Sequence, residues 1–397
     1  MESTVSNQTL PDIKHSFDLT EEQRMIRDMV REFAEGEVAP LAAEIDENHR
    51  FPVETWKKIV DLGLPGIPFS EEVGGAGGST LAYILAVEEI SKVCASTGLT
   101  LAAHVSLGTY PIYAWGGPML TEKYVPKLIA GEYMGAYGLT EPNAGSDSGG
   151  TQTHAVREGD EYVLNGRKCF ITNANHAGVF ICTAVTDKTL GPKGISAFVV
   201  PRDIPGFRVE KGEEKLGMRG SDWASLVFED ARIPADHLLG PEGQGFSTFM
   251  KTLDGGRISI GALSVGIAEG AYDCARRYAT EREAFGKRLI DQQAVQFKLA
   301  DMALQIEAAR HLIYHAARIK DEGKPYTMEG AMAKLHASEV AMKVTYDAIQ
   351  IYGGYGYSRE YPVERMWRDA KLCTIGEGTS EIQRIVIARQ IMRGANA

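Results

Sequence analysis

The spacing of apolar residues changes twice along the chain, and in the first third it has the period of a helix. After Asp18, apolar side chains recur every three or four residues, behind a Thr and a Gln that are spaced as a capping box. The residues that carry this pattern are Thr20, Gln23, Met25, Ile26, Met29, Val30 and Phe33. Similar spacing predicts helices at 52–62, 80–94, 97–110 and 119–130. We therefore expect a mobile polar segment at 1–17 and a helical domain at 18–135.

Around Tyr137 the period shortens to that of strands. Short runs rich in β-branched and aromatic residues follow one another, separated by turn residues such as Asn165-Gly166. These runs cover 162–164, 169–172, 179–182, 195–200 and 225–228. They predict an antiparallel β domain, a barrel or a sandwich, over 136–243.

The helical period returns after Gly245 and continues almost to the end of the chain. Long amphipathic segments with short connections are typical of a helix bundle. They cover 246–282, 293–322, 328–352 and 379–392. We therefore predict an α+β fold in three parts, with a C-terminal four-helix bundle at 244–397 that packs against the N-terminal helices.

Composition limits the class of protein. The 397 residues are 44% hydrophobic and 24% charged, as in soluble globular proteins. The net charge of -11 disfavours nucleic acid and anionic membranes as partners. There is no run of about 18 apolar residues that would predict a transmembrane helix. Five scattered cysteines without a CxxC pair lead us to expect reduced thiols and a cytoplasmic protein.

Glu377 is the candidate general base, because its neighbours suit a loop that presents a side chain. Gly376 and Gly378 flank it, which lets the backbone turn sharply and admits another molecule close to it. Ser380 and Gln383 are spaced as a capping box for the helix that follows. The alternative is an ordinary helix start, in which Glu377 only complements the helix dipole.

Two further stretches carry groups suited to a ligand. The small-residue run 138–150 offers backbone N–H groups and hydroxyls to a phosphate or a heteroaromatic ring, although an interdomain linker can have the same composition. Phe170 and Thr172 share one face of a predicted strand, so a ring could lie against Phe170; burial of Phe170 in the core is the simpler alternative. His311 and His315 have metal-ligand spacing but no third ligand, so we predict no metal site.

Together these segments resemble the acyl-CoA dehydrogenase family of flavoenzymes. The resemblance runs from about Asp18 to Arg393 and is closest to the butyryl-CoA and other short-chain dehydrogenases. Its most specific segments are 138–150, 168–173, 278–293, 350–356 and 376–384, and the short-chain likeness rests on 216–221, 254–257 and 361–365.

The resemblance implies FAD-dependent oxidation of a short-chain acyl-CoA thioester to the trans-2-enoyl-CoA. Glu377 matches the family's base and would remove the α-proton, while flavin N5 would take the β-hydride. The Glu377 backbone N–H and a flavin ribityl hydroxyl would hold the thioester carbonyl. A bound acyl chain would desolvate Glu377 and raise its pKa. Electrons would pass to an electron transfer flavoprotein.

The resemblance also implies binding residues, position by position. Those expected to bind FAD within one subunit are Tyr137, Leu139, Thr140, Ser146, Phe170, Thr172, Thr379 and Glu381. Those expected to reach FAD from a neighbouring subunit, which implies a homotetramer, are Arg282, Phe285, Gln293, Gln350, Gly353 and Gly354. Those expected to bind the acyl-CoA are Ser146, Asp254, Arg257, Gly376 and Gly378.

Two positions bear on the substrate. Isovaleryl-type members supply a base from the position that the resemblance equates with Gly255, so Glu377 is the only matched base. Many short-chain members have a Tyr before the base, where this chain has Gly376, so a wider pocket for a branched, cyclic or aryl acyl group is an open alternative. An acyl-CoA oxidase, which usually has additional C-terminal helices, and a non-catalytic acyl-CoA- or flavin-binding scaffold are further alternatives.

Overall fold

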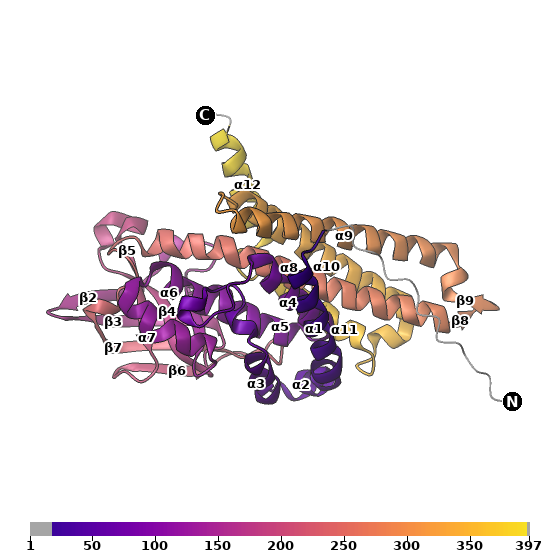
Figure 1. Ribbon diagram of the computed structural model, residues 1–397, viewed down its shortest axis with the longest axis horizontal. Coiled ribbons are helices and arrows are strands. Elements are labelled where there is room, and N and C mark those ends of the chain that lie inside the picture. Colours follow the sequence, from indigo (N-terminus) through magenta and orange to yellow (C-terminus); the bar gives the residue numbers. More distant parts are fainter. Residues whose placement is uncertain (1–17, 395–397) are drawn as a thin grey trace.

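The computed structural model describes residues 18–394, so the predicted mobile segment 1–17 lies outside the described residues. The sheet lies at one end of the long axis of the molecule, and long helices extend to the other end (Figure 1). None of the described helices combines the length and the apolar character needed to cross a bilayer. The boundaries near 135 and 243 stay predictions.

The N-terminal part is helical, as the apolar spacing predicts. The capping box is present, because Thr20 Oγ1 accepts from Gln23 N at 3.2 Å and Gln23 Oε1 accepts from Thr20 N at 3.0 Å. Its helices are α1 (Glu21–Phe33), α2 (Ala42–Asn48), α3 (Val53–Asp61), α4 (Thr80–Val93), α5 (Ala95–Ala103), the π-helical stretch η5 (His104–Thr109), α6 (Tyr110–Trp115) and α7 (Gly117–Ile129).

The middle part is a seven-stranded sheet in the order β1-β4-β2-β3-β7-β6, with β5 on β4. Its strands are β1 (Met134–Gly138), β2 (His154–Glu158), β3 (Glu161–Thr172), β4 (Ala177–Val185), β5 (Ile195–Pro201), β6 (Phe207–Lys211) and β7 (Trp223–Pro234). Strand β1 runs parallel to β4, so the antiparallel prediction is wrong for this pair. The chain returns to β1 only after a long crossover, which permits parallel pairing. The sequence missed β1, β2 and β6. Charged residues conceal the alternation in β2 and β6.

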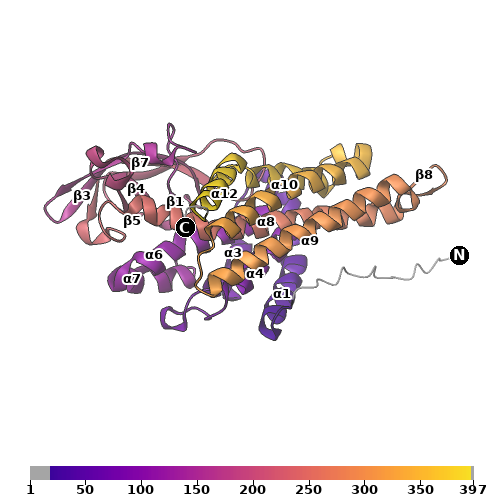
Figure 2. The ribbon, with the colours of Figure 1, turned by 90° about the horizontal axis from the view of Figure 1, so that it is seen from above.

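The C-terminal part is a bundle of α8 (Gly245–Glu281), α9 (Gln293–Asp321), α10 (Thr327–Tyr352) and α11 (Pro362–Cys373), and α12 (Ser380–Gly394) projects from it (Figure 1). The hairpin β8 (Glu283–Ala284) and β9 (Lys287–Arg288) lies at its far tip (Figure 2). Helix α11 was not predicted; its Pro362 stands at the helix start, where proline is tolerated.

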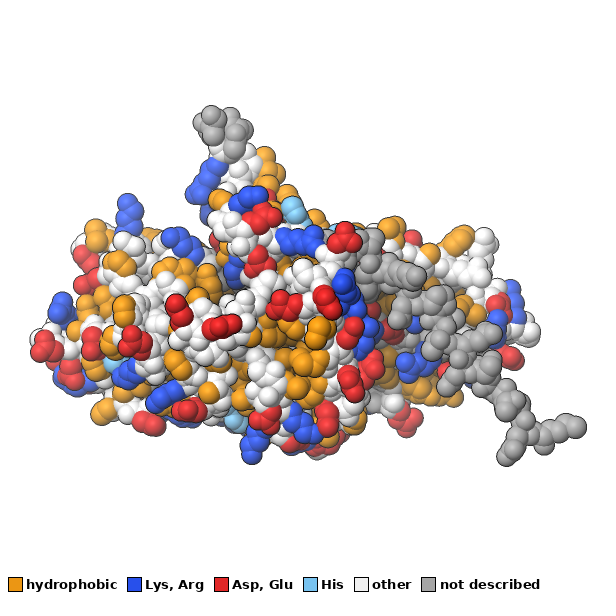
Figure 3. Space-filling view, in the orientation of Figure 1, with side chains coloured by type: hydrophobic (Ala, Val, Ile, Leu, Met, Phe, Trp, Pro, Cys, Tyr) orange, Lys and Arg blue, Asp and Glu red, His pale blue; other side chains and the backbone are white. Residues whose placement is uncertain are grey.

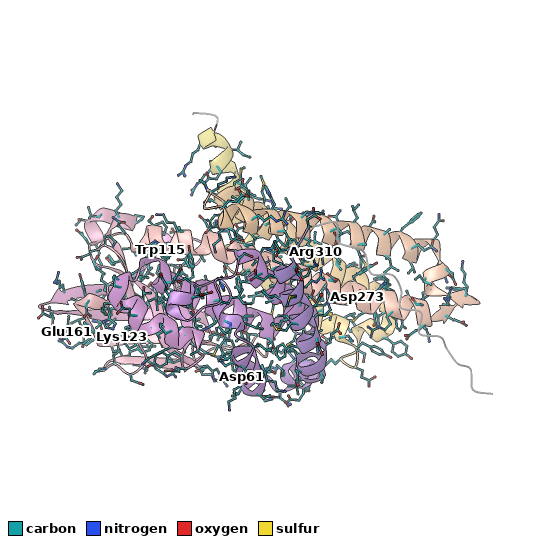
Figure 4. All side chains as sticks on the ribbon, in the orientation of Figure 1. Asp61, Trp115, Lys123, Glu161, Asp273 and Arg310 are labelled. Atoms are coloured by element: carbon teal, nitrogen blue, oxygen red, sulfur yellow. The ribbon has the colours of Figure 1, made fainter. Side chains whose placement is uncertain are left out.

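The two helical parts share one core, as predicted, because α4 packs on α8 and α9. Arg310 on α9 is 2% exposed and lies among the helices (Figure 4). Its Nε donates to Glu88 Oε1 on α4 at 2.8 Å, and the Tyr314 hydroxyl donates to Glu88 Oε2 at 2.9 Å. A buried guanidinium is tolerated only when it is paired in this way.

The N-terminal helices meet the sheet where η5 crosses β1. An added Cβ at Gly108 would lie 2.6 Å from the carbonyl carbon of Gly135, so the two backbones are in direct contact. The buried His104 fixes the same crossing, because Gly135 N donates to its Nδ1 at 3.1 Å and its Nε2 lies 3.0 Å from Leu128 O. Burial lowers the pKa of His104 to about 4, so the ring is neutral.

Gly108→Ala should lower the free energy of unfolding by about 3 kcal/mol, because backbone atoms cannot move aside as a flexible side chain can. Urea unfolding followed by circular dichroism measures the loss. Gly36→Ala is the matched control, since nothing lies within 4 Å of an added Cβ there, and we expect it to change stability by less than about 0.5 kcal/mol. Equal midpoints for the two variants would contradict the close contact.

Candidate active site

Glu377 lies in a tight turn between α11 and α12. Its φ is 54° and that of Gly378 is 94°, both in the left-handed region. An added Cβ at Gly378 would lie 2.7 Å from Gln383 Nε2, so only glycine fits there. The buried Gln383 amide donates to Glu377 O at 3.1 Å and to Gly378 O at 2.9 Å. The turn is therefore held from the first turn of α12.

The capping box predicted at Ser380 and Gln383 is wrong. Ser380 is the first helical residue, and its buried Oγ has no hydrogen-bond partner among residues 18–394. Thr379 Oγ1 accepts from Ile382 N at 3.3 Å instead. The Gln383 side chain is used to hold the Glu377 turn, which is why it does not reach back to the helix start.

The Glu377 carboxylate points at α8. An added Cβ at Gly256 would collide with its Oε2, which is buried and has no hydrogen-bond partner in the described chain. The assignment of this facing position to Gly255 is wrong, because an added Cβ at Gly255 would instead lie 3.3 Å from Lys320 Nζ. One residue along a helix turns the side chain by about 100°. The position that faces the base is also a glycine, so no second carboxylate competes with Glu377.

The environment of Glu377 suits a base that works near neutral pH. Burial raises the pKa of Glu377 to about 7, against the opposing charges of Lys334 and Arg257. A pKa near the working pH is favourable for general-base catalysis. The Glu377 N–H makes no hydrogen bond within the described residues, so it is free to donate to a ligand.

The predicted CoA residues Arg257 and Asp254 form a cluster with Thr327 where α8 meets the start of α10. Arg257 is 4% exposed and forms an ion pair with Asp254, whose Oδ2 accepts from Thr327 Oγ1 at 2.7 Å. The Arg257 Nε is buried without a partner in the part of the chain that the structure describes. The predicted CoA residue Ser146 lies on an exposed loop, and no hydrogen bond among residues 18–394 ties it to this cluster. Burial lowers the pKa of Arg257, and the nearby Glu377 charge opposes this.

Tyr137 brings β1 against α8 beside the base. Its ring stacks on Phe249 with centroids 4.2 Å apart, and its hydroxyl donates to Phe249 O at 3.0 Å. Burial and the neighbouring Glu377 charge raise the pKa of Tyr137. The sheet and the base therefore face the same region of α8.

A buried ion pair joins the predicted flavin segments 138–150 and 168–173. Lys168 Nζ donates to Glu141 Oε1 at 2.7 Å and to Leu139 O at 3.4 Å, and both charged side chains are buried. Cys169 N donates to Thr140 O at 2.9 Å. Burial by itself would raise the pKa of Glu141, but Lys168 and the donated hydrogen bonds outweigh it and lower that pKa to about 2. The pair fixes the two segments side by side.

Phe170 is presented to solvent, so its predicted core alternative is wrong. Its φ of 61° and the register shift of β3 against β7 turn the side chain outward. The ring is 50% exposed and leans on Trp223, with centroids 4.9 Å apart. The hydroxyls of Thr140 and Thr172 make no hydrogen bond among the described residues. A flat apolar face thus lies close to free hydroxyl groups.

Six of the predicted FAD residues lie far from this region. At about 1.5 Å per residue, α8 rises roughly 40 Å from Gly256 to its C-terminal end. Arg282 and the 97% exposed Phe285 lie at that tip, and the Arg282 guanidinium lies 5.9 Å from the Tyr355 ring centroid. The remaining residues of this distant group are Gln293, Gln350, Gly353 and Gly354, all exposed. Within the described chain, the two groups of predicted FAD residues therefore lie at different ends of the α8 segment that runs from Gly256 to Glu281.

Comparison of this chain with models of known protein families identifies its family. Three family models match: acyl-CoA dehydrogenase N-terminal domain over 20–132, middle domain over 136–231 and C-terminal domain over 243–392. The chain belongs to the acyl-CoA dehydrogenase family. The resemblance predicted from the sequence is therefore confirmed.

Among its relatives, a short-chain specific acyl-CoA dehydrogenase of Clostridium acetobutylicum is 55% identical over 377 residues, covering 95% of this chain and 100% of the relative. The butyryl-CoA dehydrogenase structure from Megasphaera elsdenii matches with a TM-score of 0.93 at 47% identity, covering 95% of this chain and 99% of that one. A chain from a study of the electron transferring flavoprotein of Acidaminococcus fermentans matches with a TM-score of 0.94 at 51% identity, covering 95% and 99%.

Acyl-CoA dehydrogenases are FAD-dependent oxidoreductases, and the residues of this chain fit the cofactor. The exposed Phe170 face suits the flat isoalloxazine ring, and the free hydroxyls of Thr140 and Thr172 suit its polar edge. Nothing lies within 4 Å of an added Cβ at Gly145, so the 138–150 loop is open to a pyrophosphate. Held by these residues, FAD would supply the hydride acceptor.

The sequence missed several residues of this site. Lys168 and Glu141 stood within the quoted segments but were given no role, and the facing glycine was placed one residue too early. Lys334 was not singled out, although a lysine within the Ala-Met-Ala-Lys-Leu stretch of a helix is a signal for a buried charge. The structure groups no three His, Cys, Asp or Glu side chains as metal ligands in its described part.

The raised pKa of Glu377 predicts a pH-dependent cost to stability. The folded carboxyl titrates near 7 and the unfolded one near 4.5, so wild-type stability should fall as the pH rises through this window. Glu377→Gln removes the titration. We expect the variant to be more stable than wild type at pH 8, by on the order of 2 kcal/mol, and the difference to vanish as the pH falls below 4.5, the unfolded value. Urea midpoints at both pH values measure it.

Glu381→Gln is the control, because hydrogen bonding to its own backbone N–H lowers the pKa of Glu381. A lowered pKa reverses the sign of the pH effect on stability. Relative to wild type, Glu381→Gln should therefore be less stable at pH 8 than it is at pH 4. A Glu377→Gln difference that is the same at both pH values would contradict a raised pKa in the folded protein.

Proposed function

We propose that this enzyme oxidises a short linear acyl-CoA between Cα and Cβ, with Glu377 as the base that removes the α-proton. The observation that carries the proposal is the buried Oε2 of Glu377, which has no hydrogen-bond partner among residues 18–394 and faces the glycine at 256. A carboxylate without a donor is more basic than a solvated one. The short-chain specific and butyryl-CoA dehydrogenase relatives support this substrate class.

The residues around the base have complementary roles. The unpaired Glu377 N–H would donate to the thioester carbonyl, where negative charge develops as the α-proton leaves. The Arg257 and Asp254 pair would bind the CoA part, since its buried Arg257 Nε still lacks an acceptor in the described structure. The neutralised base would hold the proton away from water.

We further propose a homotetramer. It is supported by the six predicted FAD residues at the far tip of the bundle, which only another copy can bring to the flavin segments. It is supported as well by exposed apolar side chains, gathered in part along the projecting α12 (Figure 3). These include Phe285, Phe297, Leu304, Tyr346, Tyr357, Ile385 and Ile391.

An electron transfer flavoprotein is the proposed electron acceptor. The Acidaminococcus fermentans match comes from work on such a protein, which supports a partner of that kind. We also propose a cytoplasmic location, in keeping with five cysteines that are all free of disulfides.

Glu377→Gln should bind the thioester but reduce its flavin about 10³-fold more slowly, because the amide cannot accept the α-proton. Anaerobic stopped-flow absorbance with butyryl-CoA measures the rate. Glu71→Gln, on the exposed surface of the N-terminal part, is the control and should keep the wild-type rate. Retention of the wild-type rate by Glu377→Gln would move the base to another residue.

Gly376 supports one alternative, an enzyme for a branched, cyclic or aryl acyl group. Its φ is not left-handed, and an added Cβ would meet only Leu372 atoms at 3.5 Å or more. A side chain could therefore stand at this position, and its absence leaves space beside the base.

A panel of thioesters distinguishes a short linear substrate from a branched, cyclic or aryl one. The panel contains butyryl-, hexanoyl-, isobutyryl-, cyclohexanecarbonyl- and phenylpropionyl-CoA. We expect wild type to be fastest with butyryl- or hexanoyl-CoA, and Gly376→Tyr to keep that rate within about threefold. If bulky thioesters are fastest and Gly376→Tyr slows them at least about tenfold, a change that corresponds to about 1.4 kcal/mol of transition-state binding, the alternative is correct.

A further inference from the structure

A buried lysine lies beside the Glu377 turn. Lys334 on α10 is 0% exposed, and its Nζ donates to Gly378 O at 2.7 Å. Among the described residues, no carboxylate oxygen lies within 4.0 Å of this Nζ. The carboxylate whose charge acts on Lys334 most strongly is that of Glu377.

The hydrogen bond alone does not explain a buried ammonium. Gly378 O already accepts from Gln383 Nε2 at 2.9 Å, so a neutral side chain at 334 would leave this carbonyl satisfied. Removing a lysine charge from water is costly unless an opposite charge compensates. Burial lowers the pKa of Lys334 to about 8, which still leaves it mostly protonated at neutral pH. Its charge therefore acts on Glu377.

Groups from every element packed around the pair bear on its titration. Arg257 on α8 is the second cation, and it acts on both Glu377 and Lys334. The other titratable groups that face the pair are Cys373 on α11, Glu381 on α12, Tyr83 on α4 and Tyr137 on β1. Lys334 is the cation with the larger effect on Glu377.

We propose that Lys334 is a positioning residue for Glu377: its hydrogen bond to Gly378 O holds the left-handed turn, and its positive charge stabilises the ionised carboxylate that accepts the α-proton. The inference rests on the proposed role of Glu377 as the base. It does not give Lys334 contact with the substrate.

The test separates the charge of Lys334 from its hydrogen bond. Lys334→Gln keeps a donor and loses the charge, whereas Lys334→Arg keeps both. The pH dependence of flavin reduction by butyryl-CoA, measured anaerobically in the holoenzyme, reports the ionisation of the base. Since the base acts when it is ionised, loss of a neighbouring cation moves the acid limb to higher pH.

For Lys334→Gln we expect the midpoint of the acid limb to rise by about one pH unit, and the rate at pH 6 to fall about tenfold, while the plateau at high pH stays within about threefold. Lys334→Arg should keep the wild-type midpoint even if its larger head lowers the plateau. A merely structural role would lower the plateau of both variants and leave both midpoints unchanged, which would overturn the proposal.

Lys92→Met is the matched control, because Lys92 is a partly buried lysine that pairs with Glu269 and Asp273 away from the site. It should lose stability without moving the midpoint, and an equal shift in this variant would overturn the proposal. The result also shows which of the two proposals has failed. If Glu377 is not the base, Glu377→Gln keeps the wild-type rate. If only the role of Lys334 is wrong, Glu377→Gln is inactive and Lys334→Gln keeps the wild-type midpoint.

Discussion

The site depends on one carboxylate, that of Glu377, whose buried Oε2 has no hydrogen-bond donor among residues 18–394. Water would solvate Glu377 strongly, and in the described part of the chain the positive charges of Lys334 and Arg257 partly replace that solvation. A buried, unpaired acid is a cost to folding that natural proteins retain mainly at functional sites. Here the cost is concentrated in a left-handed turn that requires Gly378 and is held by Gln383.

Helix α8 contacts all three parts of the chain. It packs on α4 and α10, receives Tyr137 from β1, and presents a bare backbone at Gly256 to the base. The sheet adds a rigid edge, because the buried Lys168 and Glu141 pair fixes Thr140 beside the outward-turned Phe170. A flavin ring between sheet and helix would therefore meet groups whose positions are set before it binds.

Local patterns were sufficient to predict the long helices, the strands β3, β4, β5 and β7, and a loop that presents Glu377, because helix period, strand composition and flanking glycines are local properties. Long-range arrangement decided the rest. The parallel pairing of β1 depends on a distant strand, the outward turn of Phe170 on a bulge against β7, and the choice of Gly256 over Gly255 on the phase of a helix. Gln383 formed no capping box because its amide is used by the turn before it. The burial of Lys334 follows from packing that sequence spacing does not specify.

The most direct measurement is an infrared titration of Glu377 in the holoenzyme, taken as the difference between wild type and Glu377→Gln across pH 5 to 9. The carboxylic acid C=O stretching band should be present at pH 5 and disappear with a midpoint near 7, which is the value that burial gives this group. A band that is already mostly lost at pH 5 and has its midpoint near 4.5 would show an ordinary solvated carboxylate, and the desolvated base would be contradicted.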